Sequence, residues 1–378
     1  MITALENGRI LTRAGFVEGS VLIEGDRVVS VIEGRATAAD TRHDLGGRRL
    51  VPGFIDTQVN GGGGVLFNDS PTVEAVARIG AAHRRFGTTG FLPTLISDDL
   101  DTVARAIAAV DAAIEAGVPG VLGIHIEGPF LNSRRKGVHD ASKFLTLDAA
   151  TVPMLTSLKH GRTLVTLAPE TTTSELIGGL VSAGAVVAAG HTNATYKVIR
   201  AALDAGLTGF THLFNAMSPL TSREAGVVGA ALDDQESWCG LIVDGRHVDP
   251  VVMRIALRAK RHDRFMLVTD AMPNVGTDNR SFMLQGRKIR VSDGVCVDEN
   301  GTLAGSALDM AAAVRNAVSM LGLDLVEAIR MASRSPARFL GLGESRGEIS
   351  AGHHADLVLL DDEAQVVETW IDGQPSQA

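Results

Sequence analysis

Short runs of aliphatic and β-branched residues alternate with alanine-rich stretches through the middle of the chain. In the stretch 101–117, Val103, Ile107, Val110 and Ile114 follow one another at spacings of four, three and four, which predicts an amphipathic helix packed on a sheet. The expected strands span residues 50–58, 90–97, 120–127, 163–169, 186–191, 209–215, 238–244 and 265–270. Eight strands alternating with helices predict an α/β fold, a (β/α)8 TIM-like barrel. A doubly wound open sheet is the alternative, because periodicity does not separate the two.

Both ends of the chain have a different pattern, that of short strands joined by turns. Residues 19–24 and 27–32 flank Gly25-Asp26 and predict a hairpin. Near the other end, residues 355–360 and 366–371 are expected to be strands. Neither end has enough strands for a stable sheet of its own.

We therefore expect the two ends to combine into one small β-sandwich domain. In this interpretation residues 1–50 and 344–378 form the β domain, and residues 51–343 form the barrel, which is the catalytic domain.

Composition and charge narrow the class of protein. The 378 residues are 45% hydrophobic and 21% charged, which excludes a largely disordered chain. The formal net charge of −9 disfavours nucleic acid as a partner, because binding to a phosphate backbone needs a basic surface. A small phosphorylated ligand remains compatible, since one or two local cations would be enough to hold it.

The sequence also indicates a compartment. Two cysteines, Cys239 and Cys296, cannot form a disulfide framework and suit a reducing environment. The first residues lack the basic and apolar segments of a signal peptide. The longest uncharged stretch, residues 176–190, is shorter than a bilayer span requires. These observations predict a cytoplasmic protein without a membrane partner.

Ionisable residues stand at the carboxyl ends of four expected strands. Glu127, His191 and His212 form a set of one carboxylate and two imidazoles, which suits a catalytic zinc ion with one position left for water. Asp270 could then act as a general base toward that water. The alternative is that these are hydrogen-bonded structural residues, but four of them at four strand ends favour the metal site. His125 shares the parity of Glu127 one layer deeper and is expected in the core.

Other polar residues allow two interpretations each. His247 follows the seventh strand and is either a substrate contact or a turn histidine. Arg223 suits a phosphate contact, although a loop arginine is usually only solvated. The basic turn 134–136, which precedes His139, is expected at the wet surface. The glycine run 61–64 forms either an anion nest or a tight turn.

Taken together, seven segments of the chain resemble the N-acetylglucosamine-6-phosphate deacetylases of the amidohydrolase superfamily. Each segment is weak evidence, but all seven in this order are specific, and the resemblance covers nearly the whole chain. The segments are Val51-Pro52-Gly53-Phe54-Ile55-Asp56, His125-Ile126-Glu127-Gly128-Pro129-Phe130, Gly190-His191-Thr192, Thr211-His212-Leu213-Phe214-Asn215-Ala216-Met217, Asp244-Gly245-Arg246-His247, Val268-Thr269-Asp270-Ala271-Met272 and Leu303-Ala304-Gly305-Ser306.

The resemblance implies hydrolysis of N-acetyl-D-glucosamine 6-phosphate to D-glucosamine 6-phosphate and acetate, a step of amino-sugar catabolism or cell-wall recycling. It implies that Glu127, His191 and His212 bind the metal, that Asp270 transfers protons, and that His139 polarises the acetyl carbonyl. One divalent metal per subunit is expected, Zn²⁺ first, with Fe²⁺, Co²⁺ or Mn²⁺ as alternatives. The implied substrate-binding positions are Val138, Asn215, Ala216, Arg223, Asp244, His247, Leu303, Ala304 and Gly305.

Two further expectations rest on the same resemblance. In relatives, the arginine that matches Arg223 reaches across a dimer interface, which implies a homodimer here. Many amidohydrolases bind a second metal through a His-x-His pair, but this chain has Gln58 and Asn60, which are poor zinc ligands, so tight binding of a second metal is not expected.

Three other functions remain as alternatives. They are deacetylation of another sugar phosphate such as N-acetylgalactosamine 6-phosphate, hydrolysis of a cyclic amide, and a catalytically inactive binding protein. A phosphate-binding barrel isomerase without a metal would leave the Glu127, His191 and His212 set unexplained.

Overall fold

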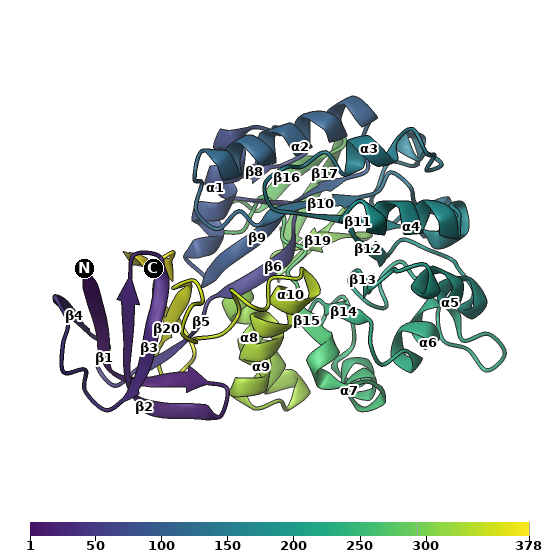
Figure 1. The fold of residues 1–378 in the computed structure, drawn as a ribbon. Helices are drawn as coiled ribbons and strands as arrows, with labels where there is room; N and C mark the ends of the chain where they lie inside the picture. The colour runs from purple at the N-terminus through teal and green to yellow at the C-terminus, as the bar shows by residue number, and fades with distance from the viewer. Residues whose placement is uncertain (293, 378) are drawn as a thin grey trace.

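Eight parallel strands in sequence order form a nearly closed barrel in the computed structural model, which describes residues 1–292 and 294–377 (Figure 1). The seam lies between the first and last strands, where Val59 and Ala271 form a parallel bridge. The predicted barrel is therefore confirmed, and the doubly wound sheet is wrong, because the strand order does not reverse. The barrel strands are β6 (Phe54–Val59), β9 (Thr88–Ile96), β10 (Gly123–Glu127), β11 (Arg162–Leu167), β12 (Val186–Ala189), β13 (Gly209–Phe210), β14 (Trp238–Leu241) and β15 (Phe265–Leu267).

Several barrel strands end earlier than the sequence pattern predicts. β12, β13 and β15 stop before His191, His212 and Asp270, whose φ angles are 48°, 33° and 53°. A residue in the left-handed region cannot continue a β ladder. Each strand therefore ends shortly before its polar residue, and the chain turns there.

Helices follow the strands and cover the outside of the barrel (Figure 1). In α2, Val103, Ile107 and Val110 are buried, as the spacing of apolar residues predicts. The helices are α1 (Val73–Arg84), α2 (Leu100–Glu115), α3 (Val152–Leu155), α4 (Ser174–Ser182), α5 (Tyr196–Asp204), α6 (Gly226–Asp233), α7 (Pro250–Ala259), α8 (Met310–Leu321), α9 (Leu325–Ala332) and α10 (Arg334–Phe339). Short 3-10 turns are η1 (Ser133–Arg135), η2 (Ala141–Lys143), η3 (Pro169–Thr171) and η4 (His262–Arg264).

Strands from both chain ends form one sheet beside the barrel, and the two termini lie close together (Figure 1). The central pairing joins β5 to β20 in antiparallel register, with Val51 opposite Val358. The predicted first hairpin is present as β2 paired with β3. The strands are β1 (Ile2–Thr12), β2 (Gly15–Glu24), β3 (Arg27–Glu33), β4 (Thr41–Asp44), β5 (Arg49–Pro52), β20 (Leu357–Leu360), β21 (Val366–Ile371) and β22 (Gln374–Gln377). The division into domains at residues 50/51 and 343/344 stays a prediction.

A four-stranded antiparallel sheet between the last barrel strand and α8 was not expected from the sequence. It consists of β16 (Ser281–Leu284), β17 (Arg287–Ser292), β18 (Val295–Val297) and β19 (Leu303–Ser306). Its inner residues Leu284, Ile289 and Cys296 pack with Ile96 and Met272 near the carboxyl ends of the barrel strands. These strands are short and carry exposed charged residues. They therefore lack the runs of aliphatic and β-branched residues that predict the barrel strands.

The glycine run 61–64 forms a tight turn, the second of its two interpretations. It contains the small hairpin of β7 (Gly61–Gly62) and β8 (Val65–Leu66). A Cβ on Gly62 would lie 2.8 Å from the His83 ring, so only glycine allows this close approach.

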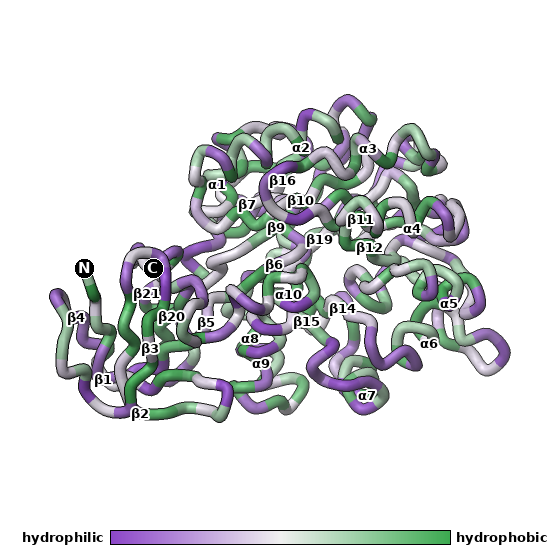
Figure 2. The backbone as a smooth tube through the Cα atoms, in the orientation of Figure 1, coloured by the Kyte–Doolittle hydropathy of each residue, from purple (hydrophilic) through white to green (hydrophobic). Residues whose placement is uncertain are grey.

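Hydrophobic segments run through the strands of both large sheets, and hydrophilic segments gather at the outer turns (Figure 2). Among the residues that the structure describes, no helix is long and apolar enough to cross a membrane.

The buried His83 leads to a prediction about acid stability. Its Nε2 lies 2.9 Å from the Gly61 carbonyl, and burial lowers its pKa from 6.5 to about 4. The unfolded chain therefore binds a proton that the folded chain excludes, so stability is lost as the pH falls below 6.5. His83→Gln keeps an N–H donor without this ionisation. Between pH 7.5 and 5 the unmodified chain should lose about 2 kcal/mol more stability than the variant.

Urea unfolding of both metal-free proteins at the two pH values measures this difference. Equal losses for the two proteins would contradict the assignment of acid sensitivity to His83.

Candidate active site

A cavity of about 380 Å³ lies at the carboxyl ends of the barrel strands. Most of the residues predicted from strand ends and from the family resemblance meet in its wall, although they come from distant parts of the sequence. The predicted residues that line it are Asn60, Glu127, Val138, His139, His191, His212, Asn215, Ala216, His247, Asp270, Leu303 and Gly305.

A larger hollow, of about 990 Å³, lies on the sheet formed by the chain ends. Its charged residues neutralise one another, since the buried Glu6 carboxylate pairs with Arg42 at 2.6 Å and with Arg35 at 3.2 Å. Among the described residues, carboxylates and imidazoles face one another only in the smaller of these two cavities.

Glu127, His191 and His212 form the centre of the cavity wall. Glu127 Oε1 lies 2.9 Å from His212 Nε2 and 3.3 Å from His191 Nε2, and the two Nε2 atoms are 3.1 Å apart. Burial alone would raise the pKa of Glu127, but the hydrogen bonds with His191 and His212 outweigh it and hold the pKa well below its usual value. The carboxylate is therefore ionised although it is only 2% exposed.

These three side chains fit a divalent metal ion. His191 Nδ1 lies 2.8 Å from the Arg135 carbonyl and donates to it, which leaves Nε2 as the ring nitrogen that could bind a metal in place of its hydrogen bond to Glu127. This nitrogen, Glu127 Oε1 and His212 Nε2 are three potential ligand atoms that lie within 3.3 Å of one another. Such an arrangement needs a proton or a cation between the atoms, and one carboxylate with two imidazoles suits Zn²⁺ with an open position.

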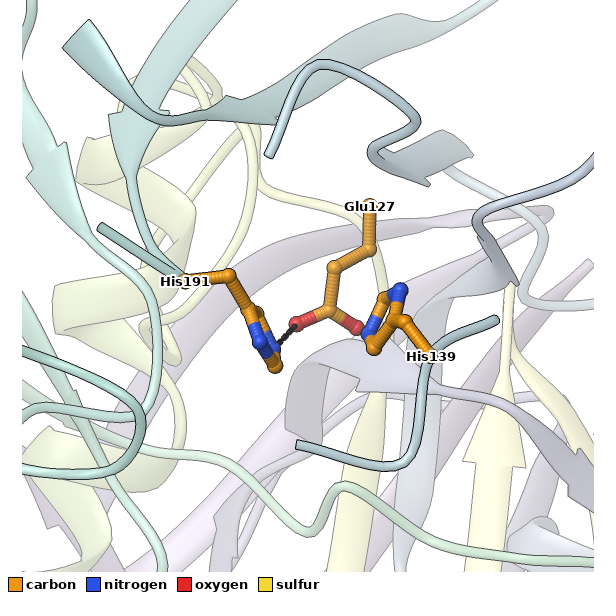
Figure 3. Close-up of side chains that lie close together, drawn as sticks. All are labelled: Glu127, His139 and His191. Atoms are coloured by element: carbon orange, nitrogen blue, oxygen red, sulfur yellow. Dashed lines mark ion pairs between the residues drawn. The ribbon is translucent and has the colours of Figure 1, made fainter. Parts of the chain in front are cut away.

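His139 lies beside this cluster, with its ring next to the Glu127 carboxylate and the His191 ring (Figure 3). Ser97 N–H donates to His139 Nδ1 at 3.3 Å, and Ser97 Oγ lies 2.8 Å from the same nitrogen. Burial and the neighbouring His191 hold the pKa of His139 well below its usual value. The ring is therefore neutral with its proton on Nε2, where it can donate a hydrogen bond to a ligand.

Asp270 faces Glu127 across the side-chain amide of Gln58. Its Oδ1 accepts from Asn60 Nδ2 at 2.6 Å and from Gln58 Nε2 at 3.2 Å. Gln58 Nε2 also donates to both Glu127 oxygens, at 3.2 and 3.1 Å. Burial, with the charge of Glu127, raises the pKa of Asp270 to about 6. Amide N–H groups thus stand between two carboxylates where a second cation would otherwise be expected.

His247 is held by Asp244. Asp244 Oδ2 lies 2.6 Å from His247 Nδ1, and Asp244 Oδ1 accepts from the Arg246 and His247 backbone amides. This leaves His247 Nε2 as the ring nitrogen available to a ligand in the cavity. Asp244, a predicted substrate contact, is not among the described residues that line the cavity, and its neighbour there is His247.

Two other predicted substrate residues also lie outside the described cavity wall. Arg223 is exposed on the loop before α6, and Ala304 is buried beneath the wall with Ile289 and Cys296. His125 is in the core as expected, with Nε2 2.8 Å from Thr166 Oγ1.

Several residues in and around the cavity were not predicted from the sequence. Arg134 and Arg135 line the cavity, although the sequence predicted that they lie at the wet surface. Their loop joins Glu127 to His139, and this position between two predicted site residues could have indicated that they lie near the site. Glu170, after β11, accepts from Thr192 Oγ1 at 2.5 Å, from Asn193 N at 2.6 Å and from Asn132 Nδ2 at 2.8 Å. It therefore joins the loop that follows His191 to the loop whose Arg135 carbonyl orients the His191 ring.

Known proteins resemble this chain in sequence and in fold. An N-acetylgalactosamine-6-phosphate deacetylase of Shewanella sp. (strain ANA-3) is 42% identical, over 98% of this chain and 94% of the relative. The crystal structure of an N-acetylglucosamine-6-phosphate deacetylase from Pasteurella multocida superposes with a TM-score of 0.96 at 34% identity and covers 100% of both chains.

An N-acetyl-D-glucosamine-6-phosphate deacetylase from Mycobacterium smegmatis, solved in complex with N-acetyl-D-glucosamine-6-phosphate, superposes with a TM-score of 0.90 at 35% identity and covers 99% of this chain and 98% of the other. The sequence profile of the amidohydrolase family matches residues 49–375. With the barrel, the strand-end residues and these relatives in agreement, the chain belongs to the amidohydrolase family.

Proposed function

We propose that this enzyme hydrolyses N-acetyl-D-glucosamine 6-phosphate to D-glucosamine 6-phosphate and acetate. The convergence of Glu127, His191 and His212 beside Asp270 in one cavity carries this proposal. The deacetylases among the relatives, including one bound to this sugar phosphate, support the choice of substrate. We place the reaction in amino-sugar catabolism or cell-wall recycling.

Glu127, His191 and His212 would hold one divalent metal ion, which we propose to be Zn²⁺. When bound, such an ion supplies Lewis acidity that makes water nucleophilic near neutral pH and stabilises negative charge on the carbonyl oxygen. Asp270 takes the proton from the attacking water and returns it to the departing amine nitrogen. A pKa raised to about 6 by burial and by Glu127 suits a residue that must both accept and release a proton.

His139 donates from Nε2 to the acetyl carbonyl oxygen and adds to the polarisation of the amide. At the other end of the substrate, Asn215, the Ala216 backbone and His247 would bind the sugar phosphate, and Val138, Leu303 and Gly305 would shape the pocket around it. Binding energy from this remote phosphate positions the acetamide for attack.

Arg223 is proposed to complete the phosphate site of a second subunit in a homodimer. Two observations support this arrangement. Arg223 is exposed on its own chain, and Leu220 on the same loop exposes 60% of its surface. The unpaired, buried Cys239 and Cys296 support a cytoplasmic location.

N-acetylgalactosamine 6-phosphate is the second candidate substrate, because the relative at 42% identity is named for that sugar. The two substrates differ only in the configuration of one hydroxyl group. Both candidates use the same metal site, proton-transfer residue and phosphate contacts.

A panel of N-acetylated sugars, each with and without the 6-phosphate, tests this function by acetate release. We expect activity on N-acetylglucosamine 6-phosphate and a large loss of kcat/KM without the phosphate, because remote binding energy is then lost. Arg223→Ala should reduce the difference in kcat/KM between the phosphorylated and the unphosphorylated sugar. Arg258→Ala, in the last turn of α7, is the control and should leave that difference unchanged. Equal activity on unphosphorylated sugars would contradict the phosphate site, and faster turnover of the galactosamine epimer would favour the second candidate.

Asp270→Asn should lower kcat by about 10²- to 10⁴-fold, because the amide cannot accept the proton of the attacking water. Metal content and the unfolding midpoint should stay close to those of the unmodified enzyme. Asp249→Asn, a change at the cap of α7 where asparagine serves equally well, is the matched control. Near-normal turnover by Asp270→Asn would contradict the role of Asp270.

Elemental analysis should find one tightly bound metal per chain, since the Gln58 and Asn60 amides already face the two carboxylates. Chelation should abolish activity, and one equivalent of metal should restore it. The double variant Gln58→His/Asn60→His should bind a second ion. Two strongly bound ions in the unmodified chain would contradict the single-metal proposal.

A further inference from the structure

The hairpin of β16 and β17 reaches the active site through its turn. Leu284 pairs with Arg287, so Gln285 and Gly286 form a two-residue turn between the strands. Leu284 lines the cavity, so the turn follows directly on a residue of the cavity wall.

The Gln285 side chain joins two segments that are far apart in sequence. Its Nε2 donates to the Ser97 carbonyl at 2.9 Å, and its Oε1 accepts from the Asp140 backbone amide at 2.9 Å. Arg287, on the other side of the turn, donates to the Val138 carbonyl. The hairpin therefore holds the residue before His139, the residue after it, and Ser97.

Both segments act on the same imidazole. Ser97 contacts His139 Nδ1 through its backbone N–H and its hydroxyl, at 3.3 and 2.8 Å. Val138 and Asp140 flank His139 in the chain and fix its backbone. Gln285 therefore connects Ser97, which contacts the His139 ring, to the loop that carries His139.

The backbone at Gln285 is unusual for its residue type. Its φ angle is 47°, and Gly286 follows with a φ of 78°, the pattern of a type I′ turn. Glycine or asparagine occupies the first position of such a turn without the steric cost that a longer side chain meets. A glutamine there is accounted for by the two hydrogen bonds that its amide makes.

We propose that Gln285 is a positioning residue for hydrolysis, which holds the His139 imidazole and its partner Ser97 so that His139 Nε2 meets the substrate carbonyl. The inference rests on the proposed role of His139 in deacetylation. Gln285 acts through His139 and does not touch the reacting atoms.

Gln285→Gly tests this proposal, because glycine favours the turn while the amide contacts are lost. We expect kcat to fall by about 10- to 100-fold, by analogy with the loss seen when the hydrogen-bond partners of metal-binding histidines are removed. KM, bound metal per chain and the unfolding midpoint should change little. Lys288→Ala, at an exposed position of the same hairpin, is the control and should keep normal kcat.

A double-mutant cycle with His139→Ala separates positioning from a general effect of the hairpin. If Gln285 acts through His139, the double variant should have a kcat less than twofold below that of His139→Ala alone. Independent, multiplicative losses would overturn the proposal, as would normal kcat in Gln285→Gly together with a defective His139→Ala.

If His139→Ala keeps full activity, the proposed role of His139 itself is wrong, and the two failures are thereby distinguished. A loss of kcat accompanied by an equal loss of bound metal would also overturn the proposal, because it would assign the effect to the metal site.

Discussion

One buried carboxylate organises the active site. Glu127 is withdrawn from water at the end of β10, yet it stays ionised because His191 and His212 both place a ring nitrogen against it. Burying a charge is costly unless partners compensate for it, and partners in a dry site interact more strongly than they would in water. Other polar groups of the site are arranged around this charge, including the amide of Gln58, which contacts both Glu127 and Asp270.

The backbone at the strand ends also helps to place the polar side chains of the site. His191, His212 and Asp270 each adopt a left-handed conformation shortly after a barrel strand, which is uncommon for residues other than glycine. Such conformations persist only where the surroundings hold them. Contacts made by Glu170 and by the Arg135 carbonyl supply that support for His191 and its loop. The site is thus built from a rigid barrel, strained strand ends and a surrounding layer of hydrogen bonds.

The sequence was sufficient to predict the barrel and the residues at its strand ends. Strands of a parallel barrel are apolar and buried, so their pattern is strong, and Glu127, His191, His212 and Asp270 stand where each pattern stops. The contacts of Gln285 with Ser97, which lie 188 positions apart, follow no periodicity and required the structure.

The short strands of β16 to β19 and the carboxylate of Glu170 were missed for the same reason. Their roles come from what they touch in three dimensions and not from their neighbours in the chain.

The pairing of β5 with β20 has a consequence for synthesis of the chain. These strands are separated by about 300 residues, which at about 5–20 residues per second take roughly 15–60 s to translate. Throughout that interval β5 is paired with β1 on one side only, and its other edge stays open until β20 is made. An unpaired strand edge is a template for aggregation. Completion of the end sheet therefore waits for the last part of the chain, and the β5 edge is open to other chains until β20 covers it.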